Sequence, residues 1–354
     1  MLQNVSSPVR HAAQAAAPAA APAAGPAANP RADARPWARA AGAPAPVDGV
    51  VIPQMPRARA TQMLAPLSLG ERHQVVQLAP RLLPRHRQQP GYNSLVPSHG
   101  VGPSSGTRYS FTACPMDRPD SAGRSYSVDS FLDNAFRSGT RTTVSLSTKG
   151  DMRHSEYYKQ NKAGGLYSVQ SSGRPSFTTM VRDARGQPVT ASIFENQVRN
   201  NHTGEVRPMK MVHINGWRDQ TALSSDSQLS LIGQLKDHLN NHDMANMAIH
   251  CSEGQNRTGC FATSLESLAA VTAHRPPNTA AHLDWFRQTR VADAVPLPSQ
   301  LTQLAENEVR MNRLAAPPAG HLHGGRGAQQ AWQAWQGAHG GHGAHAYWGR
   351  GVRH

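Results

Sequence analysis

The sequence predicts an α/β fold for residues 91–315, and two observations support this. Short apolar or β-branched runs of strand length occur between longer segments whose apolar residues recur at helical spacing. The two kinds of segment alternate along the chain, which is typical of a sheet flanked by helices. Both ends of the chain lack these patterns, so we expect a disordered leader and a disordered tail.

The first predicted helix follows Ser127, whose hydroxyl can cap the free N–H groups of the first turn. Its apolar residues share one face, from Phe131 to Phe136. Gly139 is a suitable residue to end this helix. The β-branched run 142–146 is then expected to form a strand.

A second helix is expected to start at Ser225 or Asp226, with leucine and isoleucine at helical spacing as far as Leu239. The short apolar run 247–249 has the length and composition of a buried strand. Further helices are expected over residues 258–273, 282–289 and 299–314.

Residues 1–60 are dominated by Ala-Pro repeats, which offer little area to bury and few backbone donors. A secretory signal peptide would need a continuous apolar run, which this leader lacks. A transit peptide, a type III secretion leader and a plain linker all remain open. Residues 61–90 have the broken helical pattern of a partner-binding or linker segment. Residues 316–354 are a Gly-, His- and Trp-rich tail, expected to be disordered and to hold no dedicated metal site.

Composition excludes several classes of function. The net charge of +14 permits anionic partners, but the basic residues are scattered and no nucleic-acid module is present, so we expect no nucleic-acid binding. Three cysteines without metal-ligand spacing argue against a zinc site or a disulfide framework. No apolar run approaches the roughly 18 residues that a membrane span needs, so no span is expected.

The run HCSEGQNRTG, residues 250–259, is the strongest functional motif; we call it the cysteine loop. A loop that opens a helix directs free N–H groups and the helix dipole toward one point, which favours a phosphate and a thiolate at Cys251. Arg257 can grip two phosphate oxygens with its planar guanidinium. The Thr258 hydroxyl can donate to the cysteine sulfur, and Gly254 permits a turn that a Cβ would crowd. The residues expected around the phosphate are Ser252, Glu253, Gly254, Gln255, Asn256 and Arg257.

Transfer of a phosphoryl group to cysteine also requires an acid that protonates the leaving oxygen. Asp219 is the candidate, within the run WRDQTA of residues 217–222, which we call the acid loop. One predicted helix and one strand separate it from Cys251. Trp217 can act as the hinge anchor of a mobile loop that brings Asp219 over the phosphate.

These residues resemble the classical cysteine-dependent protein tyrosine phosphatases, whose active loop has the form HC-x5-R-[ST]-G. The stretch 212–224 (VHINGWRDQTALS) is similar to the acid loop of that family, and 107–148, which begins TRYSFTACPM, is similar to its earlier part. The run 156–160 (EYYKQ) is similar to another family landmark. The sequence most resembles the type III secreted bacterial (Yop-type) tyrosine phosphatase effectors.

The resemblance implies a central mixed twisted sheet flanked by helices, with the cysteine loop at the carboxyl end of a strand. It implies hydrolysis of phosphotyrosine in two steps, through a phosphocysteine at Cys251, without metal or cofactor. Asp219 would first protonate the tyrosine oxygen and then activate water. Gln300 is the candidate for placing that water, and His250 belongs to the family's catalytic loop.

The resemblance also implies where the protein acts and on what. It implies a monomeric effector that a bacterium secretes into the host cell cytoplasm, where it acts on phosphotyrosine-containing host signalling proteins. The amino-terminal region is the expected place for a secretion chaperone.

Several positions depart from the family's pattern. Arg218 replaces a proline, Glu253 a small residue and Pro296 the first of two glutamines, while Asp151 is a candidate for the glutamate that orients the arginine. These departures leave open an alternative, a phosphotyrosine-binding module with little turnover. An arsenate reductase would need further cysteines for a disulfide relay, and we expect Cys260 to be a core residue instead.

Overall fold

The computed structural model describes residues 55–84, 93–116, 126–148, 150, 156–159 and 165–315. All of them belong to one compact unit, residues 46–354. The leader up to residue 54, the tail from residue 316 and Asp151 lie outside the described residues.

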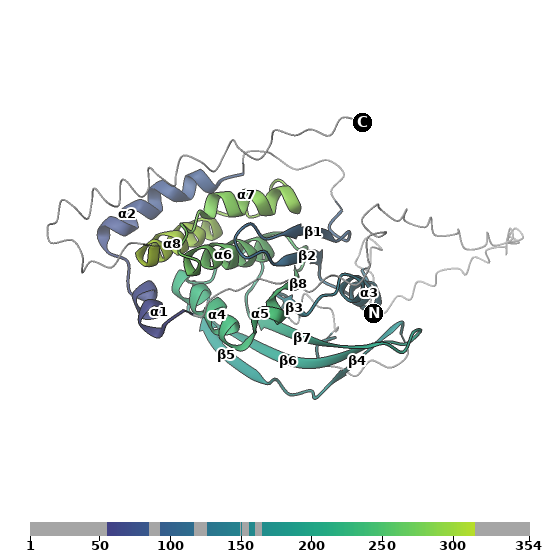
Figure 1. Cartoon of the computed structure of the whole chain (residues 1–354). Coiled ribbons are helices and arrows are strands. Elements are labelled where there is room, and N and C mark those ends of the chain that lie inside the picture. Colours follow the sequence, from purple (N-terminus) through teal and green to yellow (C-terminus); the bar gives the residue numbers. More distant parts are fainter. Residues whose placement is uncertain are drawn as a thin grey trace, which may run out of the picture. The chain divides into compact units, whose positions relative to one another are not determined.

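A mixed sheet of eight strands forms the centre of the described chain (Figure 1). The strand order is β1-β2-β8-β3-β7-β6-β4, and β5 also pairs with β6. The strands are β1 (Ser98–Val101), β2 (Arg108–Ala113), β3 (Thr142–Ser145), β4 (Tyr167–Ser171), β5 (Phe177–Arg182), β6 (Pro188–Asn200), β7 (Val206–Asn215) and β8 (Asn246–Cys251). The predicted central mixed sheet is therefore confirmed.

The four central strands, β2, β8, β3 and β7, run parallel, and the outer pairings are antiparallel. Parallel strands are covered on both faces, which explains why all four residues of β3 and five of the six residues of β8 are buried. The carboxyl ends of these strands meet at one edge of the sheet. The cysteine loop follows β8 and the acid loop follows β7 at this shared edge.

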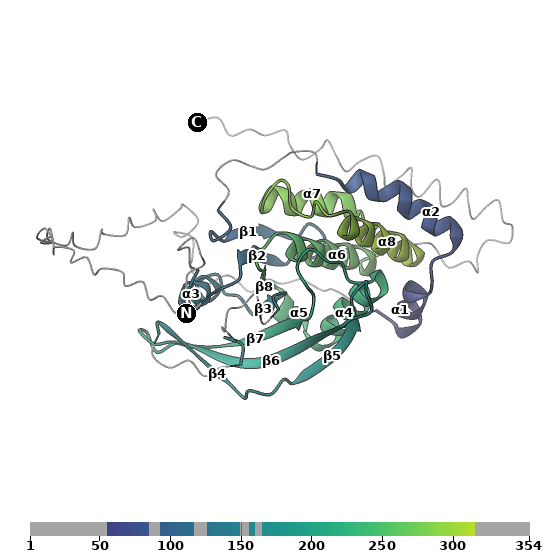
Figure 2. The same ribbon diagram turned by 180° about the vertical axis from the view of Figure 1, so that it is seen from behind.

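Helices cover both faces of the sheet. The helices are α1 (Arg57–Leu64), α2 (Leu69–Leu78), the 3-10 helix η2 (Ala79–Leu82), α3 (Val128–Arg137), α4 (Ser225–His238), α5 (Asn241–Met244), α6 (Asn256–Thr272), α7 (Thr279–Thr289) and α8 (Pro298–Ala315). Figures 1 and 2 show α4, α6, α7 and α8 gathered together, with α3 apart from them. Phe131 of α3 packs in one apolar cluster, whereas Ile249 and Phe261 belong to the other.

The predicted elements are present, with shifted ends. Ser127 caps α3 by accepting a hydrogen bond from the Ser130 N–H at 3.0 Å, and Gly139 follows with a φ of 69°. Helix α6 starts two residues before the predicted 258, and 16 of its 17 residues are buried because other helices cover the side that faces away from the sheet. Helix α7 starts three residues before the predicted 282 because Asn278 caps it.

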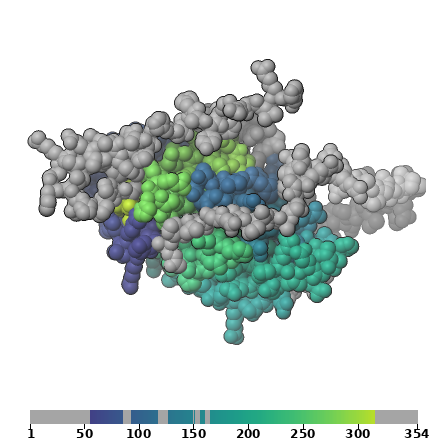
Figure 3. Space-filling model, in the orientation of Figure 1, coloured from purple at the N-terminus to yellow at the C-terminus, as the bar shows by residue number. Residues whose placement is uncertain are grey.

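Two helices and a 3-10 turn precede residue 91 and pack against α8. Helix α1 begins at Arg57, so the expectation of disorder up to residue 60 is wrong for its last residues. Met63, Val75 and Leu82 are buried in the main apolar cluster. In Figure 3 the purple amino-terminal helix lies beside the yellow end of α8. This segment therefore packs with the sheet-containing unit and is not detached from it.

Two arginines of α8 hold the amino-terminal helices. Arg310 donates to the Ala65 carbonyl at 2.7 Å, and Arg313 donates to the same carbonyl at 2.7 Å and pairs with Glu71 at 2.6 Å. These guanidinium groups satisfy carbonyls that the end of α1 leaves without helical partners. Among the helices that the structure describes, none is long and apolar enough to cross a membrane.

Candidate active site

Cys251 is the last residue of β8, a central strand of the sheet, and its side chain is buried. The chain then turns through residues 252–255 and enters α6 at Asn256. The N–H groups of a first helical turn have no helical acceptor, and the helix dipole adds positive potential there. The thiol therefore lies beside a site that suits an oxyanion.

Gly254 allows the cysteine loop to press against the neighbouring strand. Its φ is 70°, a left-handed conformation, and a Cβ at this position would collide with the carbonyl of Thr112 in β2. Any other residue would have to push the loop away from the sheet. The predicted requirement for glycine at this position is confirmed.

Arg290, just after α7, holds the outer side of the cysteine loop. Its buried guanidinium donates to the carbonyls of Glu253 at 3.0 Å and Gly254 at 3.2 Å. It also donates to the carbonyls of Ser94 at 2.6 Å and Val96 at 2.7 Å. Because the C=O and N–H of a trans peptide point in opposite directions, holding these two loop carbonyls outward directs the following N–H groups inward. Nothing in the sequence marked Arg290 as a functional residue.

Arg257 and Asp219 bring the two loops together. Arg257 lies in the first turn of α6 and is fully buried. Its Nη1 donates to the Trp217 carbonyl at 3.0 Å, and its Nη2 lies 3.5 Å from Oδ1 of Asp219. The Asp219 side chain is 49% exposed, so it is reachable from solvent. A phosphate held by Arg257 would therefore lie next to a carboxyl group.

The acid loop is anchored at one end and turns tightly at the other. Trp217 is fully buried, and its indole N–H donates to the Thr221 carbonyl at 3.0 Å. The Thr221 hydroxyl donates to the Arg218 carbonyl at 2.7 Å, and Gln220 has a left-handed φ of 57°. Trp217 thus lies where an anchor is needed, and Asp219 lies on the part of the loop that faces solvent.

Two departures from the family's pattern lie at the surface. Arg218 is exposed. Glu253 is exposed as well, while its carbonyl is held by Arg290. An exposed carboxylate is screened by water, so its repulsion of a bound phosphate is small.

Thr258 and His250 lie on either side of Cys251 in the sequence, and both are buried but differ in their hydrogen bonds. The Thr258 hydroxyl is buried and has no hydrogen-bond partner among the residues that the structure describes, so it can donate to a nearby acceptor. His250 is fully buried, and its Nε2 lies 2.6 Å from the hydroxyl of Tyr157. Burial, followed by the charges of His213 and Arg257, lowers the pKa of His250 to about 3. His250 is therefore neutral near pH 7 and unsuited to donate a proton to substrate.

Gln300 lies at the start of α8 and reaches the acid loop. It is fully buried, and its Nε2 donates to the Thr221 carbonyl at 3.0 Å, the same oxygen that accepts from Trp217. This contact ties the acid loop to α8. A role in placing water stays a prediction; Oε1 of Gln300 has no hydrogen-bond partner among the described residues and can accept a hydrogen bond from water.

The remaining residues expected around the phosphate differ in what their side chains do. Ser252 and Gln255 are half-buried at the loop. The Asn256 side chain instead accepts a hydrogen bond from the Val295 N–H at 3.2 Å, so it faces the segment after α7.

Cys260 is fully buried, and burial raises its pKa, as expected for a core thiol. Within the described part of the chain, no group of three His, Cys, Asp or Glu residues is arranged to hold a metal ion.

The chain is similar to known proteins in sequence and in structure. A family model described as protein-tyrosine phosphatase matches residues 124–305, just over half of the 354 residues. Two solved structures are similar to the chain. One is the catalytic domain of human protein tyrosine phosphatase non-receptor type 18, with 17% identity and a TM-score of 0.48 over 61% of this chain and 74% of that one. The other comes from work on the structural basis of the PTPN18 fingerprint on distinct HER2 tyrosine phosphorylation sites. It has 16% identity and a TM-score of 0.48 over 61% of this chain and 72% of that one. No curated protein sequence matches the chain.

Proposed function

The chain belongs to the protein-tyrosine phosphatase family, and from this premise we propose that it hydrolyses phosphotyrosine through a phosphocysteine intermediate on Cys251. The observation that carries the proposal is the 3.5 Å contact between Arg257 and Asp219. It supports the proposal because a guanidinium that suits a phosphate, a carboxyl group and the thiol that precedes the same helix all lie at the carboxyl ends of neighbouring strands.

In the first step, the thiolate of Cys251 attacks phosphorus, and the bond between phosphorus and the tyrosine oxygen breaks. The protonated carboxyl group of Asp219 gives its proton to that oxygen, which leaves as neutral tyrosine. Arg257 and the inward N–H groups of the cysteine loop stabilise the charge on the transferred phosphoryl oxygens.

In the second step, the carboxylate of Asp219 takes a proton from water as the water oxygen attacks phosphorus. The sulfur–phosphorus bond breaks, phosphate leaves, and the thiolate of Cys251 is restored. The buried Thr258 hydroxyl supports this step by donating a hydrogen bond to the departing sulfur. Asp219 ends the cycle protonated and ready for the next substrate.

A phosphotyrosine-binding module with little turnover is the competing proposal, motivated by Arg218, Glu253 and Pro296. A binding module needs the guanidinium of Arg257 but no acid beside it. Arg218 and Glu253 are both exposed, so neither of these two departures is buried in the site. We therefore favour the enzyme with full turnover.

Release of phosphate from a phosphotyrosine peptide and a matched phosphoserine peptide tests the proposal, with the full chain and its Cys251→Ser and Asp219→Ala variants. We expect turnover of the phosphotyrosine peptide only, no turnover by the serine variant, and loss of about two orders of magnitude or more in the alanine variant. Rapid acid quenching should trap a phosphorylated Cys251 peptide, detected by mass spectrometry. Tight phosphotyrosine binding without turnover would establish the binding module instead.

We also propose that a bacterium secretes this enzyme into the host cell cytoplasm, where it acts as a monomer on host signalling proteins. Two features support this: the Ala-Pro leader with almost no acidic residues, and the resemblance of the cysteine and acid loops to Yop-type effectors. A secretion chaperone is the proposed partner of the amino-terminal region.

Delivery can be tested by fusing residues 1–60 to a reporter enzyme in a bacterium with a type III secretion system. We expect the reporter in the host cytoplasm, and only when the system is intact. A reporter that stays in the bacterium would rule out this leader as the signal. Light scattering of the purified chain tests whether it is a monomer.

A further inference from the structure

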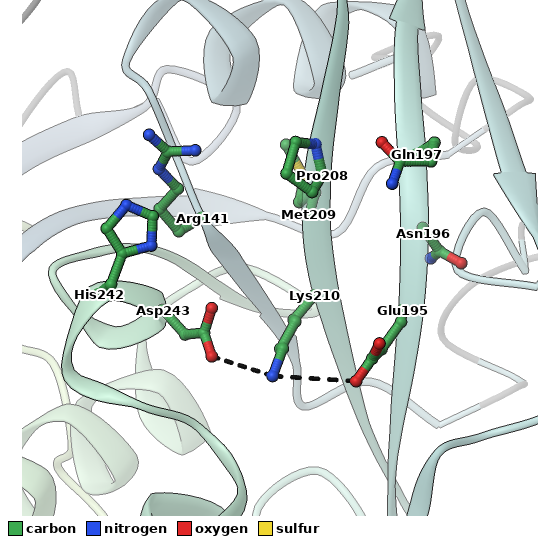
Figure 4. Close-up of a pocket in the computed structure, with 9 residues that line it drawn as sticks. All are labelled: Arg141, Glu195, Asn196, Gln197, Pro208, Met209, Lys210, His242 and Asp243. Carbon is green, nitrogen blue, oxygen red and sulfur yellow. Dashed lines mark ion pairs between the residues drawn. The ribbon is translucent and has the colours of Figure 1, made fainter.

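A cavity of about 360 Å³ lies away from the cysteine loop (Figure 4). It is lined by residues of β6, β7 and α5, and by Arg141 immediately before β3. Thr142, the first residue of β3, pairs with Lys210 of β7, and Arg141 is the residue before it. Helix α5 leads directly into β8. The cavity is therefore at the amino ends of β3 and β8. At about 3.3 Å per residue, the six residues of β8 separate it from Cys251 by roughly 15–20 Å.

Lys210 and Asp243 neutralise each other on one side of this cavity. The Lys210 ammonium lies 3.0 Å from Oδ2 of Asp243 and donates to the His238 carbonyl at the end of α4. Asp243 also accepts from the N–H of Asn240 as part of the cap of α5. Both groups are thus satisfied within the protein and have little to offer a ligand.

Two charges remain on opposite walls. Arg141 is half-buried beside His242, and its guanidinium makes no side-chain hydrogen bond or ion pair within the residues that the structure describes. Glu195 lies across the cavity on β6 (Figure 4). Its side chain is 64% exposed, and its ion pair with Lys210 is long, at 3.9 Å. The cavity therefore has a cationic wall and an anionic wall, with the neutralised pair between them.

We propose that this cavity binds a small dipolar ligand, with a carboxylate at one end and an ammonium at the other, as in an amino acid. The planar guanidinium of Arg141 matches a carboxylate in geometry and charge, and Glu195 is placed to meet the ammonium. A phosphate dianion fits less well because the carboxylate of Glu195 would repel it. The volume falls in the range of small-molecule sites.

Straight-chain ω-amino acids are suitable probes because their two charges are separated by a known number of methylenes. Binding of glycine, 4-aminobutanoate and 6-aminohexanoate to the full chain would be followed by ligand-observed NMR. Butanoate, hexanoate, butylamine and hexylamine are the matched probes with a single charge, and inorganic phosphate is the dianion. We expect at least one amino acid to bind about tenfold or more tightly than the carboxylate and the amine of its length, as one charge-assisted contact predicts.

Variants assign the two ends of the ligand. Arg141→Gln should weaken the binding of amino acids and of carboxylates alike, by about tenfold or more. Glu195→Gln should instead make an amino acid bind no more tightly than the carboxylate of its length. Arg81→Gln changes the net charge equally on the exposed surface of η2, which packs against α7 and α8, and should leave binding unchanged. Because the cysteine loop also attracts anions, binding must survive Arg257→Ala. Phosphatase activity should not change in the Arg141 variant.

Three results would overturn the proposal. The first is the absence of binding by every amino acid at millimolar concentration. The second is equal binding of carboxylates and amino acids, which would indicate a simple anion site. The third is binding that Arg257→Ala abolishes, which would place the ligand at the cysteine loop.

Discussion

The carboxylate of Asp219 lies 3.5 Å from Nη2 of Arg257, and this contact joins the acid loop to the first turn of α6. The guanidinium is fully buried, whereas the carboxylate is half-exposed. A phosphoryl group bound to Arg257 would therefore meet the carboxyl group of Asp219 at the solvent side of the site. The contact brings the proposed acid and the proposed phosphate-binding arginine together.

The role of Asp219 predicts a dependence on the leaving group. Asp219→Asn keeps the shape of the side chain but cannot give a proton, so kcat/KM for a phosphotyrosine peptide, which reports the first step, should fall by about 10²–10⁴. Aryl phosphates with acidic phenols should lose much less, because those phenolates leave unprotonated. The measurement is kcat/KM across a series of aryl phosphates, with Asp226→Asn, an exposed acid on α4, as the control. An equal loss across the series would show that Asp219 acts by positioning alone.

Thr258 predicts an accumulation of phosphoenzyme. Its buried hydroxyl has no other hydrogen-bond partner in the described part of the chain, so Thr258→Ala should mainly slow the step in which sulfur leaves. A hydrogen bond to a developing charge is worth about 1.5–3 kcal/mol, or roughly 10–100-fold in rate. Stopped-flow assays should show a burst of phenol equal to the enzyme concentration, and Thr258→Ser should restore the wild-type pattern. Steady phenol release without a burst would argue against this role.

Gln300 can be tested as a loop anchor or as the residue that places water. Its contact with the Thr221 carbonyl favours the anchor, so Gln300→Ala should lower the rate of phosphocysteine formation about fivefold, the effect of one hydrogen bond of about 1 kcal/mol. Gln303→Ala, a buried amide one turn further along α8, is the matched control. If Gln300 places water instead, the first step is unchanged and a burst of phenol appears.

The cysteine loop could be predicted from sequence because its chemistry is local. Cys251 ends β8, Gly254 lies in the turn that follows, and Arg257 and Thr258 lie in the first turn of α6, so spacing alone brings the thiol, the turn and the guanidinium together. Ser127 is a similar case, because a cap involves residues three positions apart. Local rules of this kind located each predicted helix and strand to within three residues, but they did not predict β1, β2, β4, β5, β6 or β7 individually.

Contacts between distant segments could not be predicted in the same way. Arg290 binds main-chain carbonyls about 36 and 195 residues away, and a carbonyl has no sequence signature. The amide of Gln300 meets Thr221 across 79 residues. Arg310 reaches the end of α1 across 245 residues, which is why residues before 91 read as a linker. Each contact depends on the assembled layers and not on a local pattern.

His282 predicts how stability depends on pH. It is buried between Ser104 and Ser267, with contacts of 2.8 and 2.9 Å to their hydroxyls, and burial lowers its pKa to about 4. In the unfolded chain a histidine titrates near pH 6.5. Between pH 6.5 and 4 the unfolded state therefore binds a proton that the folded state does not. The free energy of unfolding falls as the pH drops through this window, by up to about 1.4 kcal/mol per pH unit from this residue.

The variant His282→Gln removes this titration while keeping an amide that can bond to the two hydroxyls. At pH 7 it should be less stable by about 1–3 kcal/mol, because a buried hydrogen-bonded site is disturbed. From pH 6.5 to pH 5, however, it should lose about 1–2 kcal/mol less than the wild type. Urea unfolding at several pH values measures both effects, with His202→Gln, an exposed histidine, as the control. His250 is buried in both proteins and so does not contribute to the difference. Parallel curves of stability against pH would show that folding does not lower the pKa of His282.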